Sequence, residues 1–298
     1  MEQKNVPNKP ATAPRPAAPA APKTGEAKGG GSALAAIVIP LALVISYVVW
    51  KFVMGDGSHF QGGNNHNNPM PGDYLGIVYK GGVIVPILMS FFLIVVTFSI
   101  ERFLTISRAK GTKSIETFVR TVRQKLNVND ITGAIAACDQ QKGSVANVVK
   151  SGLLKYQEMA RERGMDKDQK ILAIQKEIEE STALELPMLE KNLVIISTLA
   201  SVATLVGLLG TVFGMINAFA ALANAGAPDA VGLANGISEA LINTALGILT
   251  SAIAIIMYNF FTSKIDELTY SIDEAGFSII QTFAAQHGDN GVQNGVVA

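Results

Sequence analysis

The feature that most constrains this 298-residue chain is a pair of long uncharged stretches in its C-terminal half. No charged residue lies between Lys191 and Asp229, and none lies between Glu239 and Lys264. A helix needs about 20 residues to cross a bilayer core of about 30 Å, because each residue advances it by about 1.5 Å. Both stretches are therefore predicted to form membrane-spanning helices, over residues 191–223 and 237–263.

Small residues recur along one face of each predicted helix. Such faces let helix backbones approach closely in lipid, where no hydrophobic force drives helices together. The stripes indicate helix packing, and the residues expected to provide it are Gly207, Gly210, Gly214, Gly247 and Ser251.

Each small face also carries a hydroxyl group, at Thr211 or Thr244. A threonine in a membrane helix can bond to the backbone carbonyl one turn back, or the two can line a shared polar path. Glu239 lies at the start of the second helix, with Asn243 one turn on. It is either an interfacial acid favoured by the helix dipole or a relay group for a cation. These four residues are the candidate proton-pathway residues.

Composition also favours a membrane protein. Charged residues make up 16% of the chain, against about 25% in soluble domains. Two further apolar tracts predict spans at 33–54 and 83–105, and a cleaved signal peptide is the less favoured alternative for the first of these. The fold class expected is an all-α membrane protein with four spans. The remaining segments are predicted as a disordered tail at 1–32, a Gly/Asn loop at 55–82, a helical domain at 106–190, a loop at 224–236, an amphipathic helix at 264–286 and a loose tail at 287–298.

Within the helical domain, Asp130 is predicted to cap one helix. Another begins near Asp168 and carries Ile171, Ile174, Ile178 and Leu184 on one apolar face. We expect this helix to continue through Pro187 straight into the third span, with its acids forming a solvated face or a vestibule for cations. The 264–286 helix is expected to pack on the domain through Leu268, Ile272 and Phe277.

Positive charges are distributed unevenly. Five Lys/Arg fall in 1–32 and fifteen in 106–191, whereas the 55–82 loop has only Lys80 and the 224–236 loop has none. Cytoplasmic segments carry the Lys/Arg excess, so both termini and the helical domain are predicted to be cytoplasmic.

No enzyme motif is evident. HExxH, GxxxxGK[ST] and GxSxG do not occur, and the single cysteine, Cys138, excludes an internal disulfide and a cysteine-based metal site. Cys138 is expected to act as a small apolar residue. His59, His66 and His287 lie in loops or a tail and are expected to be solvated. We expect no catalysis, cofactor or metal.

Two motifs in order, GLLGTVFGMINAF (Gly207 to Phe219) and ISEALINTALGILTSAIAIIMYN (Ile237 to Asn259), resemble the ExbB/TolQ branch of the MotA/TolQ/ExbB proton-channel family. The resemblance covers about Gly82 to Phe277 and includes the Glu101-Arg102-Phe103 sequence, in which we interpret Glu101 and Arg102 as an interfacial charge pair. Where the family often has Ala-Pro, this chain has Ala203-Thr204. Its predicted first span is additional to those of three-span ExbB and TolQ proteins.

The resemblance implies that Thr211 and Thr244 face a lumen, near the aspartate of a single-span ExbD- or TolR-like partner, and that Glu239 is the motif's glutamate. It also implies an inner-membrane motor in which five copies enclose two partner helices and the proton gradient drives a TonB- or TolA-like protein. A TolQ-like role in outer-membrane integrity and a flagellar or gliding stator remain alternatives. A structural membrane scaffold is the alternative of another class, and it would not need the threonines.

Overall fold

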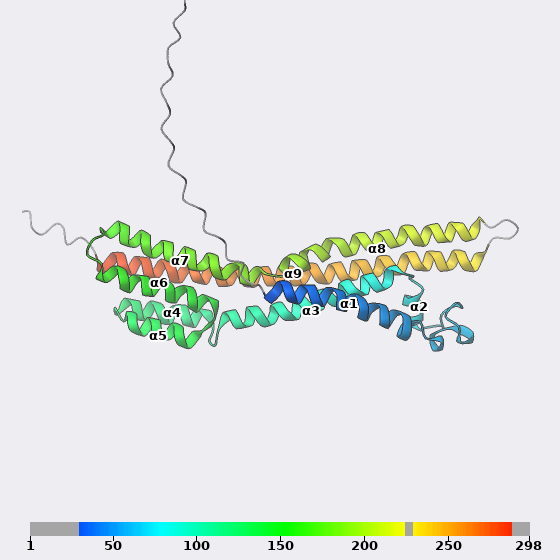
Figure 1. Cartoon of the computed structure of the whole chain (residues 1–298), viewed down its shortest axis with the longest axis horizontal. Coiled ribbons are helices and arrows are strands. Elements are labelled where there is room, and N and C mark those ends of the chain that lie inside the picture. The colour runs from blue at the N-terminus through cyan, green and yellow to red at the C-terminus, as the bar shows by residue number, and fades with distance from the viewer. Residues whose placement is uncertain (1–29, 224–228, 288–298) are drawn as a thin grey trace, which may run out of the picture.

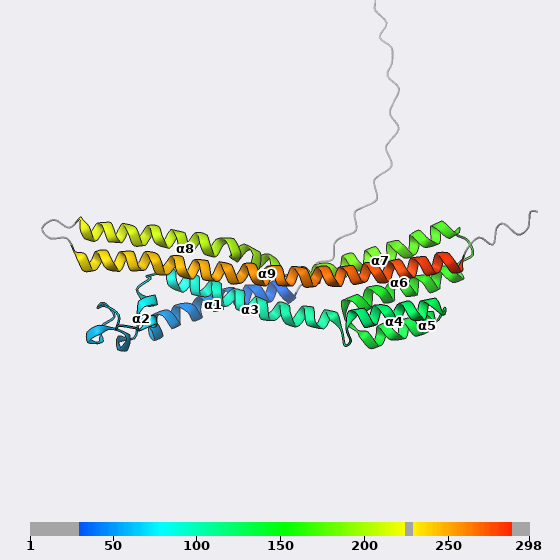
Figure 2. The ribbon, with the colours of Figure 1, turned by 180° about the vertical axis from the view of Figure 1, so that it is seen from behind.

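The computed structural model describes residues 30–223 and 229–287, and these form an elongated, almost entirely helical molecule (Figure 1). The longest helix, α9, runs nearly the whole length, and α8 lies antiparallel beside its N-terminal half. Helices α1 and α3 also lie along this half, whereas α4, α5, α6 and α7 gather around the C-terminal half, as the reverse view shows (Figure 2).

Four helices among the described residues are long and apolar enough to cross a membrane, and that part of the chain contains no strand. The all-α class with four candidate spans is therefore confirmed. The helices are α1 (Gly30–Val48, extended by a π-helical segment Val49–Met54), α2 (Tyr74–Tyr79), α3 (Ile84–Lys110), α4 (Ile115–Asn127), α5 (Ile131–Gln141), α6 (Gly143–Arg161), α7 (Lys167–Glu190), α8 (Leu193–Leu222) and α9 (Ala230–Gln286).

The predicted loop at 55–82 is a compact cap at one end of the molecule. Trp50 stacks on Tyr79 with 4.9 Å between ring centroids, and Phe60 is 1% exposed. His59 Nδ1 lies 2.7 Å from Asp73 Oδ2, and this hydrogen bond lowers the pKa of Asp73, which also caps α2. His59 is thus paired and half-buried, so the expectation that it is solvated is wrong.

The predicted helical domain consists of α4, α5, α6 and α7. Helices α4, α6 and α7 pack against α9, and α5 packs on α4 and α6. Asp130 caps α5, accepting the Gly133 N–H at 2.8 Å, as expected. Asp166 begins α7 with a capping box. One continuous apolar cluster joins this domain to the membrane helices.

Helix α7 does continue through Pro187, but it does not run straight into the next span. It ends at Glu190, and Asn192 adopts a left-handed conformation with φ 66° before α8 begins at Leu193. That part of the prediction is wrong. Asparagine is among the few residues that tolerate this conformation, so the break has a local cause in the sequence.

Helix α9 differs in extent from the two predicted segments. It starts at Ala230, where Asp229 caps it, and continues without interruption to Gln286. Residues 230–236 of the expected loop are therefore helical, and the span expected at 237–263 and the amphipathic helix expected at 264–286 form one helix. Of the tail predicted at 1–32, residues 30–32 belong to α1, so that part of the prediction is wrong. Residues 1–29, 224–228 and 288–298 lie outside the described residues.

Two residues expected on buried faces are not buried. Leu184 is 77% exposed and Phe277 is 62% exposed, whereas Ile174, Ile178, Leu268 and Ile272 are buried. Packing continues past both residues, with Leu189 buried in α7 and Phe283 buried in α9. At about 100° per residue, Leu184 lies about 120° around the helix from Ile178 and Phe277 about 140° from Ile272, so both side chains point away from the packed face.

Cys138 is buried in α5, and burial raises the pKa of its thiol to about 12. At pH 8 about one thiol in 10,000 is then ionised, and the thiolate is the reactive form. We predict that the folded protein resists maleimide labelling and that unfolding in denaturant exposes the site. A matched control, Val128→Cys in a Cys138→Ala background, places a thiol at a position that is 74% exposed and should label at once. Rapid labelling of native Cys138 contradicts the buried assignment.

Candidate functional site

The two C-terminal spans meet along a seam of small residues. Cβ atoms added at Gly207, Gly210 and Gly214 would lie 2.9 Å from Asn243 O, 2.4 Å from Asn243 Cβ and 2.5 Å from Ala240 N. None of these separations can accommodate a side chain without movement of the backbone or of a buried neighbour. The expected packing glycines therefore lie where α8 and α9 touch backbone to backbone.

The other half of the seam lies on α9. A Cβ at Gly247 would lie 2.7 Å from Ala203 O, and one at Gly236 would lie 2.5 Å from Ala218 N. Ser251 Oγ donates to the carbonyl of Ala200. The seam therefore extends over several turns, and it is closed by a serine hydrogen bond.

Thr211 and Thr244 lie at the edge of this seam and are half-buried. Thr211 Oγ1 donates to Leu208 O at 2.5 Å, and Thr244 Oγ1 donates to Ala240 O at 3.2 Å. Their sequence neighbours Gly210 and Asn243 are in contact, so the two threonines lie at a similar level along the helix pair. Each hydroxyl uses its proton locally, and its oxygen keeps a lone pair that can accept a hydrogen bond.

Glu239 forms a polar cluster nearer the tip of the hairpin formed by α8 and α9. Its Oε2 accepts a hydrogen bond from Asn217 Nδ2 at 3.0 Å. Gly82, in the turn before α3, has φ +77°, and a Cβ there would lie 2.4 Å from Glu239 Oε1. The turn therefore needs glycine for its conformation and for the space that the carboxylate occupies.

Asn243 is fully buried and links three helices. Its Nδ2 donates to Gly81 O at 2.8 Å, which ties α9 to the turn before α3, and its side chain packs on Gly210 of α8. Its Oδ1 is buried and has no partner among the described residues. Asn243 therefore clamps α8, α9 and the turn before α3 from a buried position, whereas the neighbouring threonines are half-buried at the edge of the seam.

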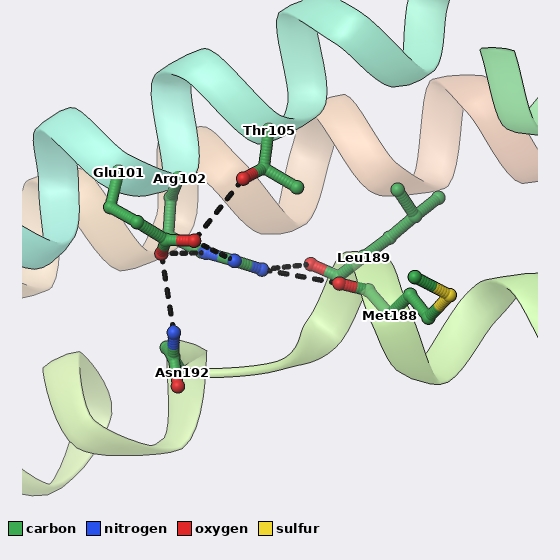
Figure 3. Close-up of polar contacts among 6 residues, drawn as sticks. All are labelled: Glu101, Arg102, Thr105, Met188, Leu189 and Asn192. Atoms are coloured by element: carbon green, nitrogen blue, oxygen red, sulfur yellow. Dashed lines mark hydrogen bonds and ion pairs between the residues drawn. The ribbon is translucent and has the colours of Figure 1, made fainter. Parts of the chain in front are cut away.

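A second polar site lies where α3 meets the break between α7 and α8 (Figure 3). The Arg102 side chain is 3% exposed. Its Nη1 donates to Leu189 O at 3.1 Å and to Met188 O at 3.3 Å. These carbonyls belong to the last turn of α7, which has no basic residue of its own. Arg102 thus supplies, from another helix, the donor and positive charge that a helix C-terminus favours.

Glu101 completes this site. Its two oxygens accept from Arg102 Nε, at 2.6 Å, and from Arg102 Nη2. The same carboxylate accepts from Thr105 Oγ1 at 3.2 Å and from Asn192 Nδ2 at 3.3 Å. The Glu101–Arg102 pair therefore joins α3 to the end of α7 and to the left-handed residue that precedes α8.

The predicted pairing of Glu101 with Arg102 is confirmed. Sequence reasoning missed Asn217, the role of Asn192 and the backbone partners of Arg102. Asn217 is the one carboxamide between Leu193 and Ala223, which is a signal that could have been followed. The partners of Arg102 are backbone carbonyls 86 and 87 residues away, and no local pattern indicates them.

Comparison with known proteins agrees with this architecture. Residues 140–274, which include α8 and the seam, match the MotA/TolQ/ExbB proton channel family. The chain carries a MotA/TolQ/ExbB family domain. The predicted resemblance is therefore confirmed.

Individual relatives are similar at modest identity. The Tol-Pal system protein TolQ of Pseudomonas aeruginosa is 26% identical over 156 residues, 52% of this chain and 68% of the relative. The biopolymer transport protein ExbB of Pseudomonas putida is 34% identical over 86 residues, 29% of this chain and 26% of the relative. The ExbB protein of Neisseria meningitidis serogroup A is 26% identical over 212 residues, 67% of this chain and 92% of the relative. Relatives of both names are consistent with the ExbB/TolQ branch.

The close approach of α8 and α9 predicts a severe effect of Gly214→Val. The added side chain meets the backbone of α9, and overpacking of this kind costs about 1–3 kcal/mol. We expect a lower thermal unfolding temperature of the purified protein in detergent. Met215→Val, at the next residue, which is 37% exposed, is the matched control and should unfold normally. Equal unfolding temperatures for the two variants contradict the close backbone contact between α8 and α9 at Gly214.

The buried guanidinium predicts that Arg102→Met destabilises the protein. The substitution leaves Glu101 without its cation and the α7 carbonyls without a donor, and breaking a buried pair costs about 3–5 kcal/mol. Because Glu101 is partly exposed, at 24%, we expect the lower end of that range, measured by thermal unfolding and by proteolysis near Asn192. Arg108→Met, on the same helix at an exposed position, should have little effect. If Arg102→Met has the thermal unfolding temperature and protease resistance of the unaltered protein, Arg102 does not stabilise the junction between α7 and α8.

Proposed function

We propose that this chain is the proton-channel subunit of an inner-membrane motor that works with an ExbD-like partner to drive a TonB-like protein for outer-membrane transport. The observation that carries the proposal is that Thr211 and Thr244 are half-buried and lie at a similar level along the tightly packed α8–α9 seam. Their hydroxyl oxygens can accept a hydrogen bond from a protonated carboxyl group. The names of the relatives support the same class of role: one is a Tol-Pal system protein and another is a biopolymer transport protein.

The chain's own side chains explain why a partner is needed. Between Lys191 and Lys264, the membrane stretches of α8 and α9 carry one carboxylate, Glu239, and it is held in the cluster near the hairpin tip. Threonine can solvate a proton but cannot bind and release it at physiological pH. In this proposal the partner supplies an aspartate. The aspartate binds a proton from the side of higher proton concentration, passes Thr211 and Thr244 in its protonated form, and releases the proton on the other side.

An oligomer is part of the proposal. In the single chain, α8 packs mainly on α9 and leaves large apolar side chains exposed on its other sides, such as Leu205, Val212 and Phe219 at 63%, 51% and 60%. Further copies, partner helices and lipid can cover these surfaces. We propose a homopentamer around the partner helices, with both termini and the α4–α7 domain in the cytoplasm, following the Lys/Arg excess.

The same observations support a TolQ-like role in outer-membrane integrity as the second candidate, because the P. aeruginosa TolQ alignment covers 68% of that protein. The identity of the copurifying partner proteins distinguishes the two roles. A TolR–TolA pair copurifying with the chain assigns the second role, and an ExbD–TonB pair assigns the first.

Replacement of the threonines tests the channel. Thr211→Val and Thr244→Val keep the volume nearly constant but remove the acceptor, and an unpaired polar group costs about 1–3 kcal/mol. That corresponds to roughly 5- to 150-fold slower proton transfer. We predict normal pull-down of the partner with a loss of gradient-driven substrate uptake in energised cells. Glu239→Gln should be milder, because Glu239 lies nearer the hairpin tip.

The matched control is Thr198→Val, which alters an exposed threonine of α8 that bonds to Val194 O. It should leave uptake unchanged. Normal uptake by both Thr211→Val and Thr244→Val shows that the threonines serve packing alone and removes the basis of the proposal.

A further inference from the structure

A cleft of about 180 Å³ lies where α3 ends and α9 leaves its uncharged stretch. Its walls come from the C-terminal part of α3, the start of α4 and the middle of α9. Phe103 and Phe260 form an apolar side, whereas Lys110, Lys264 and Glu267 form a charged side with the hydroxyl of Ser107. The cleft therefore has one apolar and one cationic wall, at the edge of the membrane-spanning region.

The charged wall has a net charge of +1. Lys264 Nζ pairs with Glu267 Oε2 at 2.7 Å, and Lys110 has no ion-pair partner among the described residues. Hydrogen bonding from Lys264 lowers the pKa of Glu267, and the positive charge of Lys110 lowers it further. The two lysines therefore act on the same small volume, and only one of the two charges is balanced within it.

The apolar wall indicates which anion fits. Phe103 is 58% exposed and Phe260 is 43% exposed, and both lie on helices that continue directly into membrane spans. Exposed aromatic rings beside cations at this depth suit a molecule with an apolar chain and an anionic head. A soluble anion would leave the rings without a partner.

We propose that this cleft binds the phosphodiester headgroup of one anionic glycerophospholipid, from the leaflet on the side of the α4–α7 domain. The single negative charge of the phosphodiester balances the net charge of the wall, with Lys110 as its main cation. The glycerol and the first part of the acyl chains lie against Phe103 and Phe260. A zwitterionic headgroup brings an additional cation, which the two lysines repel.

The test uses the full-length protein, purified in detergent, stripped of lipid and titrated with dioleoylphosphatidylglycerol. Native mass spectrometry then counts the lipids retained per protomer. A cation near a membrane surface contributes about 1 kcal/mol, so Lys110→Gln and Lys264→Gln should each weaken binding about fivefold. Glu267→Gln should strengthen binding by a similar factor, because it removes the competing anion. This opposite sign separates a headgroup site from general damage to the fold.

Lys176→Gln is the matched control, because Lys176 is a 71% exposed lysine of α7 that also pairs with a glutamate. It should bind phosphatidylglycerol like the unaltered protein. Equal loss in this variant, or equal retention of dioleoylphosphatidylcholine, overturns the proposal. Binding of inorganic phosphate with the affinity of the lipid would assign the cleft to a soluble anion instead. A disulfide between protomers through Ser107→Cys, in a Cys138→Ala background, would show that another copy covers the cleft.

Discussion

A buried guanidinium holds the membrane helices and the helical domain together. Arg102 is removed from water, so its charge requires compensation within the protein. Glu101 supplies the anion, and the last carbonyls of α7 supply further acceptors. Because α7 ends on this cation, the chain can break at Asn192 and redirect into α8 without leaving the helix end unsatisfied. Together with the shared apolar cluster and the uninterrupted helix α9, this side chain fixes the position of the domain relative to the spans.

In the seam between α8 and α9, the residues that pack the helices differ from those proposed to take part in proton transfer. Glycine and alanine bring the two backbones together, and the polar side chains of Asn243 and Ser251 also take part in that contact. Thr211 and Thr244 bond within their own helices. The helix pair is therefore complete without them, and their oxygen atoms are available for another purpose.

The sequence alone predicted the features that depend on local composition. Uncharged length predicts the four spans, small residues at helical spacing predict the seam, and Asp130 predicts the start of α5. It did not predict the break at Asn192, because a helix with good propensity on both sides indicates continuity. It also did not predict the burial of Arg102 or the clamp from Asn243 to Gly81. Both contacts join backbone carbonyls to side chains from distant segments, and their geometry exists only after the helices pack.

Helix α9 is about 85 Å long at about 1.5 Å per residue, and between Gly247 and Gly276 it contains neither glycine nor proline. The two connections between the membrane part and the domain therefore differ: α7 and α8 meet at a left-handed break held by Arg102 and Glu101, whereas α9 is one uninterrupted helix. Each residue of a helix turns it by about 100°. The number of residues between the seam and the domain thus sets the angle between them around the axis of α9, and a rotation of this helix at one end acts on the other through its unbroken ladder of backbone hydrogen bonds.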